Sequence, residues 1–435
     1  MQPYFAPPGN PFSERPLPPT AFIASIKRLG PWLPDAPGLP PVGLAVSGGG
    51  DSLCLAWLAR HWRKNLLAFV VDHGLRADSA QEARLTLQRL AAMDVPARLL
   101  TLTNLAKGPG MAERARQARY AVLAQACREA GCLDLLLGHQ ADDQVETIRM
   151  RQDSGSGPDG LAGMGWVTAL PDVRLVRPLL GVSRLALRET LRQAGLTWVD
   201  DPSNQDTRAT RVRVRHNLQE QDTRLALWET SLCAGAARMQ RDAEQASILS
   251  RHVAFRPEGW ACLGPELPEP EVLSRLIRGV GGALYPPSPA AVARLRAAGQ
   301  EATLAGVHLV RRRADWYLVR EAAAMAAPLP AEGGARWDNR FELSIPSALS
   351  GQGLQIGAAG LGLDRGVRGG WPALFCATLP ALWRQGQRVA VPHLGWWAEG
   401  QFKYARFLFQ PPVSVTGSGV YGWPEVKADG RATRE

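Results

Sequence analysis

Short apolar runs alternate with segments of helical periodicity between residues 42 and 218. The apolar runs cover residues 42–46, 66–71, 97–102 and 133–137, and the helical segments cover 53–62, 79–93, 111–130 and 183–194. This alternation predicts an α/β fold, in which helices cover both faces of a parallel sheet. Ligands of such sheets bind at the carboxyl ends of the strands, so we expect the chemistry in the loops that follow the apolar runs.

The second half of the 435-residue chain has a less regular pattern. We predict a long helix at residues 227–250, then short helices and two strands at 303–311 and 316–320. An Ala-, Pro- and Gly-rich stretch at 324–334 predicts a linker before a Gly- and Trp-rich remainder. The predicted organisation is a Pro-rich N-terminal extension (1–40), an α/β domain (41–218), a helical linker with a central domain (219–325), and a small α+β C-terminal domain (326–435).

The composition indicates a globular protein with an anionic partner. Hydrophobic residues make up 46% of the chain, charged residues 21%, and the net charge is +10, which favours nucleic acid as the partner. No apolar run approaches the roughly 20 residues that a membrane helix needs. Residues 1–20 are rich in proline and lack the features of a signal peptide, so we expect a disordered lead-in and a cytoplasmic protein without a membrane partner.

The six cysteines include no Cys-x-x-Cys pair. Their spacing argues against a zinc ribbon, an iron–sulfur cluster and a disulfide framework. We therefore expect reduced thiols and no structural metal.

The loop Ser47-Gly48-Gly49-Gly50-Asp51-Ser52 joins the first predicted strand to the first predicted helix. Glycine lets the backbone approach a polyphosphate closely, and the N–H groups at a helix start face such an anion. Asp51 can hold Mg²⁺ together with phosphate oxygens. The loop lacks the Gly-Lys-Ser/Thr ending of kinases and GTPases. It resembles the pyrophosphate (PP) loop of ATP pyrophosphatases, which adenylate a substrate; an ordinary Gly-rich turn is the alternative.

Two carboxylates are predicted to share one face of a helix that follows the strand at 133–137. If this helix begins near Ala141, Asp143 and Glu146 lie three residues apart on one face. Such a pair is suited to binding an ammonium group or a metal ion. The alternative is a solvated acidic first turn that complements the helix dipole.

Two pairs of arginines form further basic helix faces. Arg116 and Arg119 are spaced to contact phosphate of ATP or RNA, and Arg211 and Arg215 follow the polar loop 200–206 on a helix that could anchor nucleic-acid phosphates. For both pairs the alternative is a solvated cationic face.

Together these motifs resemble the tRNA(Ile)-lysidine synthase family. The resemblance covers roughly residues 42–215 and includes Asp72-His73-Gly74-Leu75, the segment 115–120, the segment 139–147, the segment 154–158 and Asp201-Pro202-Ser203-Asn204-Gln205-Asp206. It implies an adenine nucleotide α-hydrolase-like (PP-loop) fold. It also implies a ligase that uses ATP to adenylate carbon 2 of the wobble cytidine in the CAU anticodon of tRNA(Ile). The ε-amine of free L-lysine then displaces AMP to give lysidine.

The resemblance also implies roles for individual residues. Ser47, Gly48, Gly49, Gly50, Asp51 and Ser52 would bind the ATP phosphates, with Asp51 toward Mg²⁺. Asp143 and Glu146 would hold the α-ammonium group of lysine, and Asp51, Asp143 and Arg116 would be catalytic. Arg119, Arg211 and Arg215 would contact tRNA or phosphate. The oligomeric state is left open, a homodimer included.

The chain departs from the family pattern at three positions. Asp72 replaces the first histidine of His-His-Gly-Leu, Gln140 replaces the second histidine of His-His-x-x-Asp, and Val212 follows Arg211 where asparagine is common. The lysine ε-amine, with a pKa of about 10.4, must lose a proton before it attacks. Asp142, Asp143 and His139 are the bases that the sequence offers. The alternative activities are tRNA 2-thiolation by an enzyme of the same PP-loop class and amide formation by a small-molecule synthetase.

Overall fold

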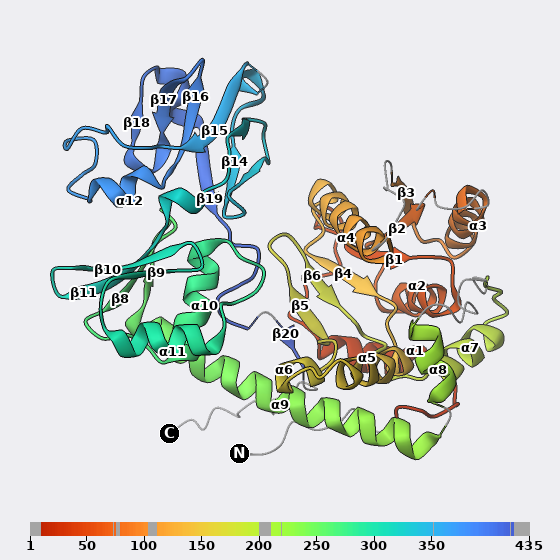
Figure 1. Cartoon of the computed structure of the whole chain (residues 1–435). Coiled ribbons are helices and arrows are strands. Elements are labelled where there is room, and N and C mark those ends of the chain that lie inside the picture. Colours follow the sequence, from red (N-terminus) through yellow and green to blue (C-terminus); the bar gives the residue numbers. More distant parts are fainter. Residues whose placement is uncertain are drawn as a thin grey trace, which may run out of the picture. The chain divides into compact units, whose positions relative to one another are not determined.

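The computed structural model describes residues 10–72, 74, 79–102, 111–199, 210–218, 220–350, 352–417 and 419–421. It divides into two compact units (Figure 1). Unit 1 comprises Met1–Arg241 with Ser418–Glu435, and unit 2 comprises Asp242–Gly417. None of the described helices combines the length and the apolar character needed to cross a membrane.

Unit 1 is built on a seven-stranded sheet with the order β20-β5-β6-β4-β1-β2-β3. Its parallel strands are β1 (Val42–Val46), β2 (Leu66–Asp72), β3 (Ala97–Thr101), β4 (Asp134–Leu137) and β6 (Arg174–Val176). The four predicted parallel strands are confirmed. Two antiparallel strands that the sequence pattern did not reveal, β5 (Val167–Ala169) and β20 (Gly419–Val420), complete one edge.

Helices cover both faces of this sheet (Figure 1). They are α1 (Pro19–Lys27), α2 (Gly50–Trp62), α3 (Ser79–Ala92), α4 (Met111–Ala130), α5 (Ala141–Asp153), α6 (Pro158–Leu161), α7 (Arg184–Gln193) and α8 (Thr210–Asn217). Side chains alternate between the faces along each strand, so Leu44 belongs to the core cluster that includes residues of α1, α2, α5 and α7, whereas Ala45 belongs to the cluster that includes residues of α4. Both faces of β1 are therefore buried, which explains its unbroken apolar sequence.

The Pro-rich N-terminal extension is ordered where the structure describes it. Phe22 and Ile26 of α1 are fully buried in the core of unit 1. The Leu17 N–H group donates a hydrogen bond to Thr190 Oγ1 at 2.8 Å, and the Asp35 carboxylate accepts one from the Asn65 N–H group at 3.0 Å. The prediction of a disordered lead-in is therefore wrong for residues 10–20. Apolar residues spaced one turn apart in α1 bury enough surface to hold the segment in place.

Unit 2 begins with an antiparallel sheet of order β7-β8-β11-β10-β9. The strands are β7 (Ala254–Phe255), β8 (Ala261–Gly264), β9 (Ala302–Leu304), β10 (Val307–Arg312) and β11 (Asp315–Arg320), and α10 (Pro270–Gly281) and α11 (Pro289–Ala298) pack with them. The predicted strand 303–311 is divided, because Ala305 and Gly306 adopt positive φ angles of 51° and 73° and make a turn. The long helix α9 (Gln221–His252) contains the boundary between the units.

The rest of unit 2 contains two smaller antiparallel sheets. One consists of β12 (Leu329–Pro330), β15 (Leu354–Ala358), β16 (Pro380–Arg384), β17 (Gln387–Val391) and β18 (Trp396–Trp397); the other consists of β13 (Arg336–Trp337), β14 (Phe341–Ser344) and β19 (Arg406–Phe409). The short helix α12 (Ala373–Ala377) and 3₁₀ turns at Ala322–Ala324, Ser347–Leu349, Pro392–Leu394 and Gly400–Tyr404 connect them. The predicted C-terminal range 326–435 includes β20, which the structure assigns to the sheet of unit 1.

Candidate active site

The predicted phosphate loop lies between β1 and α2, at the carboxyl end of the sheet. Ser52 closes it, because its Oγ donates to the Gly49 carbonyl oxygen at 3.0 Å and accepts from the Ser47 N–H group at 3.1 Å. Gly48 has a φ angle of 87°, and a Cβ atom there would lie 2.3 Å from Thr86 Oγ1. This position therefore requires glycine for its conformation and for the close approach of α3.

The start of α2 fits an anion. Its N-cap residue is Gly49, which has no side chain that could accept hydrogen bonds from the N–H groups of the first turn. A Cβ atom at Gly138 would lie 3.1 Å from Ser52 Cα, so the end of β4 packs directly against this turn. These features match the backbone cradle that a polyphosphate needs.

Helix α5 begins at Ala141, as predicted, and carries Asp143 and Glu146 on one face. Gln140 caps it: its Oε1 accepts hydrogen bonds from the N–H groups of Asp142 at 2.5 Å and Asp143 at 3.4 Å. Asp143 Oδ2 in turn accepts from the Gln140 N–H group at 3.2 Å, which completes a capping box. The Asp143 carboxylate is therefore fixed at the helix start.

Three guanidinium groups of the chain itself lie against these carboxylates. Arg211 Nε donates to Glu146 Oε2 at 2.8 Å, and Arg215 Nε donates to Glu146 Oε1 at 2.6 Å. Arg184 Nη2 lies 3.4 Å from Asp143 Oδ1 and 3.7 Å from Glu146 Oε1. The pair thus binds cationic N–H groups, and the predicted alternative of a solvated acidic turn does not apply, because the Glu146 side chain is only 2% exposed.

Arg184 also joins the phosphate loop to α5. Its Nε lies 3.7 Å from Asp51 Oδ2. Burial raises the pKa of Asp51 to about 6, although Arg184 opposes the shift. Burial likewise raises the pKa of Asp143 despite the nearby Arg211 and Arg184, whereas for Glu146 the contacts with Arg215 and Arg211 outweigh burial and lower the pKa. Asp51 and Asp143 are therefore carboxylates that a further cation would stabilise.

Arginines from α4 and α8 act electrostatically on His139, a partly buried histidine at the end of β4. His139 Nδ1 is buried and has no hydrogen-bond partner among the described residues. Burial, reinforced by Arg177, Arg211, Arg116 and Arg119, holds the pKa of His139 well below its usual value. Its imidazole is therefore neutral. The predicted arginines Arg116 and Arg119 of α4 and Arg211 of α8 all influence this one side chain. Arg116 is exposed, with its guanidinium 5.2 Å from the Tyr120 ring centroid.

Sequence reasoning missed two residues of this site, Arg184 and Arg224. Asp142 Oδ2 accepts from the Arg184 N–H group at 2.8 Å, and Asp142 Oδ1 accepts from the Arg224 guanidinium. Arg184 opens a helix after β6 and Arg224 lies in α9, so only the tertiary fold brings them to α5. The predicted motif 201–206 and His73 lie outside the described residues.

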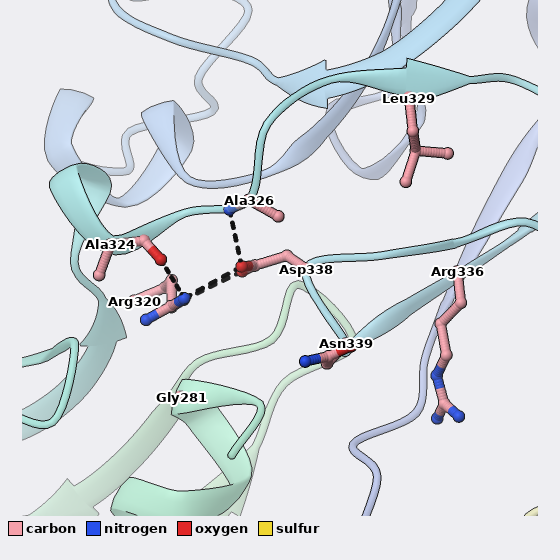
Figure 2. A pocket seen from close by; sticks show the side chains of 8 residues that line it. All are labelled: Gly281, Arg320, Ala324, Ala326, Leu329, Arg336, Asp338 and Asn339. Carbon is pink, nitrogen blue, oxygen red and sulfur yellow. Dashed lines mark hydrogen bonds and ion pairs between the residues drawn. The ribbon is translucent and has the colours of Figure 1, made fainter. Parts of the chain in front are cut away.

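Unit 2 contains a second ionic cluster, which lines a cavity of about 390 Å³ (Figure 2). The Asp338 carboxylate accepts hydrogen bonds from Arg320 Nε at 3.0 Å, Arg340 Nε at 2.8 Å and the Ala326 N–H group at 3.0 Å. Arg320 also donates to the Gly306 carbonyl oxygen at 2.8 Å. The cluster thus joins β11, the segment after it and the β13–β14 turn.

Within the part of the chain that the structure describes, no group of three or more His, Cys, Asp or Glu side chains is arranged to hold a metal ion. A single carboxylate can still hold Mg²⁺ when phosphate oxygens supply further ligands, and Asp51 at the phosphate loop fits this arrangement. Cys54, one turn after Asp51, is fully buried, and burial raises its pKa.

A comparison with known protein families agrees with the fold of unit 1. A family model described as a PP-loop domain matches residues 27–222, which confirms the predicted fold class and the use of ATP. Among solved structures, the U34-tRNA thiolase NcsA from Methanococcus maripaludis with its [4Fe-4S] cluster matches 49% of this chain and 77% of that chain, at 17% identity and a TM-score of 0.41.

Three curated relatives share one name. A tRNA(Ile)-lysidine synthase from Ruegeria pomeroyi is 34% identical over 83% of this chain and 91% of the relative. The enzymes of that name from Novosphingobium aromaticivorans and Bradyrhizobium diazoefficiens are 39% and 36% identical to this chain. Each match covers 66% of this chain, and the matches cover 91% and 85% of the two relatives, respectively. Because each match extends over most of this chain and most of the relative, the chain belongs to the tRNA(Ile)-lysidine synthase family.

Proposed function

We propose that this chain ligates L-lysine to carbon 2 of the wobble cytidine in the CAU anticodon of tRNA(Ile), with ATP and Mg²⁺. The cytidine is first adenylated with release of pyrophosphate, and the ε-amine of lysine then displaces AMP. Membership of the family supports the reaction. The net charge of +10 supports a tRNA substrate.

One observation carries the proposal: Arg184 spans the phosphate loop and the carboxylate pair of α5. Its guanidinium lies 3.7 Å from Asp51 and 3.4 Å from Asp143. A nucleotide bound at the loop and an amine bound at α5 would therefore meet within the reach of one side chain. An α-ammonium group offers the carboxylates the same kind of charged N–H donor that Arg211 and Arg184 now offer.

Different residues of the site would bind ATP, lysine and phosphate in the two steps. Asp51 and the N–H groups of the first turn of α2 would hold the polyphosphate with its Mg²⁺, which withdraws charge from the phosphate oxygens when bound. Asp143 and Glu146 would bind the α-ammonium group of lysine and leave its ε-amine free. Arg116 and Arg119 would contact phosphate near His139.

The three candidate bases differ in how far their polar atoms are already engaged. Both Asp142 oxygens already accept hydrogen bonds, from Arg224 and from the Arg184 N–H group. The low pKa of His139 makes it a weak base. Asp143 also accepts hydrogen bonds on both oxygens, from the Gln140 N–H group and from the guanidinium groups of Arg184 and Arg211, and burial raises its pKa.

Incorporation of radiolabelled lysine into an unmodified CAU-anticodon tRNA(Ile) transcript tests the proposal, with ATP, Mg²⁺ and a parallel measurement of AMP release. We expect label in tRNA(Ile) and none in tRNA(Met), which shares the anticodon. AMP release without label would contradict lysine as the nucleophile, and sulfur or ammonia donors would then be tested. Absence of AMP release would contradict the role given to the phosphate loop.

A further inference from the structure

Arg177 follows β6 directly and is buried at the carboxyl end of the sheet of unit 1. The residue is only 7% exposed. Its backbone N–H group donates to the Trp166 carbonyl oxygen at 2.8 Å. Its Nη1 donates to the Gly165 carbonyl oxygen at 2.7 Å and to Thr168 Oγ1 at 3.0 Å. Contacts with β5 and the residues before it therefore fix this guanidinium in place.

The positive charge of Arg177 has no counter-charge among the residues that the structure describes. The two hydrogen bonds of Nη1 go to uncharged oxygens, and Nε is buried without a partner in the described part of the chain. Burial lowers the pKa of Arg177, and the side chains that oppose this shift are Tyr120 and Tyr421. Phenol groups, unlike carboxylates, do not neutralise a guanidinium at neutral pH. Buried charges are normally paired, so an unpaired one at the binding edge of a sheet calls for an anionic ligand.

Arg177 lies on the face of the sheet that α4 covers. Leu175, two residues earlier and therefore on the same face, belongs to the core cluster that includes residues of α4. Tyr120 of α4 packs against this cluster, and the Arg116 guanidinium lies 5.2 Å from its ring centroid. Arg177 thus adds a buried positive charge beneath the arginines that α4 carries toward His139.

The strand order separates this charge from the phosphate loop. β4 lies between β6 and β1, so Arg177 is two strands, or roughly 10 Å, from the strand that leads into the loop. The loop itself accounts for the phosphates of ATP, and the second anion then comes from the RNA. A base that reacts inside a pocket leaves the stack of its neighbours, and the phosphate beside it loses water as well. A buried guanidinium suits such a phosphate, because hydrogen bonds between these two groups are charge-assisted.

We propose that Arg177 binds a phosphodiester group next to the wobble cytidine of the RNA substrate and is its buried counter-charge. The inference rests on the proposed function, because it assumes that the RNA enters the site along the face covered by α4. Arg116, which is exposed, would meet the same RNA backbone from the solvent side.

Binding of a tRNA(Ile) transcript to the whole protein, measured over a range of salt concentrations without ATP or lysine, tests this role apart from turnover. In Arg177→Gln we expect the affinity for RNA to fall by about tenfold, as the loss of a hydrogen bond between charged groups implies. The slope of log affinity against log salt concentration should become shallower by about 0.7, the value for one phosphate contact with a single strand.

Two further variants separate charge from structure. Arg177→Lys keeps the charge, so its salt slope should equal that of the wild type. Arg177→Met is uncharged and has a flexible side chain that fills buried sites, so it should reproduce the shallower slope of Arg177→Gln. Affinity for magnesium–ATP should be unchanged in all three variants.

Neutral methylphosphonates identify the phosphate. We expect one of the two positions that flank the wobble cytidine, substituted one at a time, to lower the affinity of the wild-type protein by about tenfold. The same substitution should lower the affinity of Arg177→Gln by less than about twofold, because the contact is already lost.

Arg174→Gln is the matched control on the same strand. Arg174 lies at the other end of β6 and is paired, since its Nε is 2.5 Å from Asp134 Oδ1. This variant should lower the melting temperature and leave the affinity for RNA and its salt slope unchanged.

Three results would overturn the inference. A wild-type salt slope in Arg177→Gln and Arg177→Met would show that Arg177 serves the β5–β6 edge alone. Equal losses of affinity from the methylphosphonates in wild type and Arg177→Gln would show that Arg177 touches neither phosphate. A loss of magnesium–ATP affinity with unchanged RNA binding would assign the anion to the nucleotide.

The proposed function fails by different results. If the wild-type protein bound RNA but incorporated no lysine, the proposed reaction would be wrong, and the salt slopes would still decide the role of Arg177. If the wild-type protein bound no RNA, both would fail.

Discussion

Two ionic clusters, one in each unit, are built from the same chemical groups and differ in how well their carboxylates are satisfied. In unit 2, Asp338 accepts hydrogen bonds from two guanidinium groups and one backbone N–H group, and these outweigh burial and lower its pKa. In unit 1, the Asp51 carboxylate has a long ion pair with Arg184, and burial raises its pKa to about 6. Both carboxylates lie among guanidinium groups, yet only the contacts of Asp338 outweigh its burial.

This difference separates Asp338 from Asp51; it does not extend to Glu146, whose pKa is also lowered by its contacts with Arg215 and Arg211. A buried carboxylate with a full set of donors stabilises the fold, and removal of one partner leaves an uncompensated charge. A buried carboxylate whose pKa is raised destabilises the fold until a cation arrives. The cavity beside Asp338 is therefore a poor place to look for the reaction (Figure 2). The four predictions that follow test this distinction.

The largest effect is expected for Asp51→Asn. Loss of the carboxylate removes the metal-facing charge, so adenylation should fall by about 10³-fold or more, measured as tRNA-dependent AMP and pyrophosphate formation. The melting temperature should stay the same or rise, because the folded state no longer holds an ionised group that burial disfavours. A variant that lost activity and melting temperature together would show that Asp51 is structural, as Asp338 is.

The converse is expected for Asp338→Asn in unit 2. Arg340 is 1% exposed and would keep a buried charge without its carboxylate, so unfolding free energy should fall by about 3 kcal/mol in denaturant titrations. Magnesium–ATP affinity should be unchanged. Glu399→Gln is the control, because Glu399 pairs with Arg384 at the surface, at 3.0 Å, and its loss should change stability by less than about 1 kcal/mol. Similar losses in both variants would remove the contrast.

For Glu146→Gln, the effect on binding should be confined to one substrate, while stability should also fall because Arg211 and Arg215 lose their carboxylate partner. The neutral amide binds an ammonium group less well than a carboxylate, so the KM for lysine should rise by about 10- to 100-fold, while the affinity for magnesium–ATP is retained. Asp153→Asn is the control on the same helix, because Asp153 forms an exposed pair with Arg149 at 3.0 Å. Equal loss of ATP binding and lysine binding in Glu146→Gln would contradict the separate roles of the loop and α5.

The sequence predicted the parts of unit 1 that follow from local pattern. Apolar runs located β1 to β4, and the positions of Asp143 and Glu146 one turn apart predicted the shared face that α5 presents. The glycine loop was recognisable because its conformation demands particular residues, as the φ angle of 87° at Gly48 shows. Such features depend on neighbours in the chain, so the sequence alone carries them.

The features that the sequence did not reveal depend on distant segments. Arg184 has no local signal, because its role arises only where α7 begins beside α5. β20 consists of two residues and pairs with β5 more than 200 residues earlier, so no periodicity reveals it. Residues 10–20 seemed unable to fold because they are rich in proline, yet contacts such as Leu17 with Thr190 hold them in place.

The two clusters should also respond differently to mild acid. Asp51 has a folded-state pKa of about 6, above the value of 3.8 expected for an unfolded chain, so the folded state takes up a proton between these values. The destabilisation by its ionised form is complete above about pH 6 and is relieved as the pH falls toward about 4. Asp338 has a folded-state pKa below 3.8, so its contribution is complete above that pH and is lost only as the pH falls further, through its folded-state pKa.

Melting temperatures of the metal-free, nucleotide-free protein and the two variants, from about pH 7 to about pH 4, measure this difference directly. Any increase in the melting temperature of Asp51→Asn over the wild type should be greatest near pH 7. It should disappear near pH 4, because the wild-type carboxyl is then protonated. The deficit of Asp338→Asn should persist over the whole range, because that carboxylate is still ionised in the folded protein. A deficit that shrinks over the same interval would mean that the guanidinium groups do not hold Asp338 in its ionised form. The distinction between the two clusters would then rest on Asp51 alone.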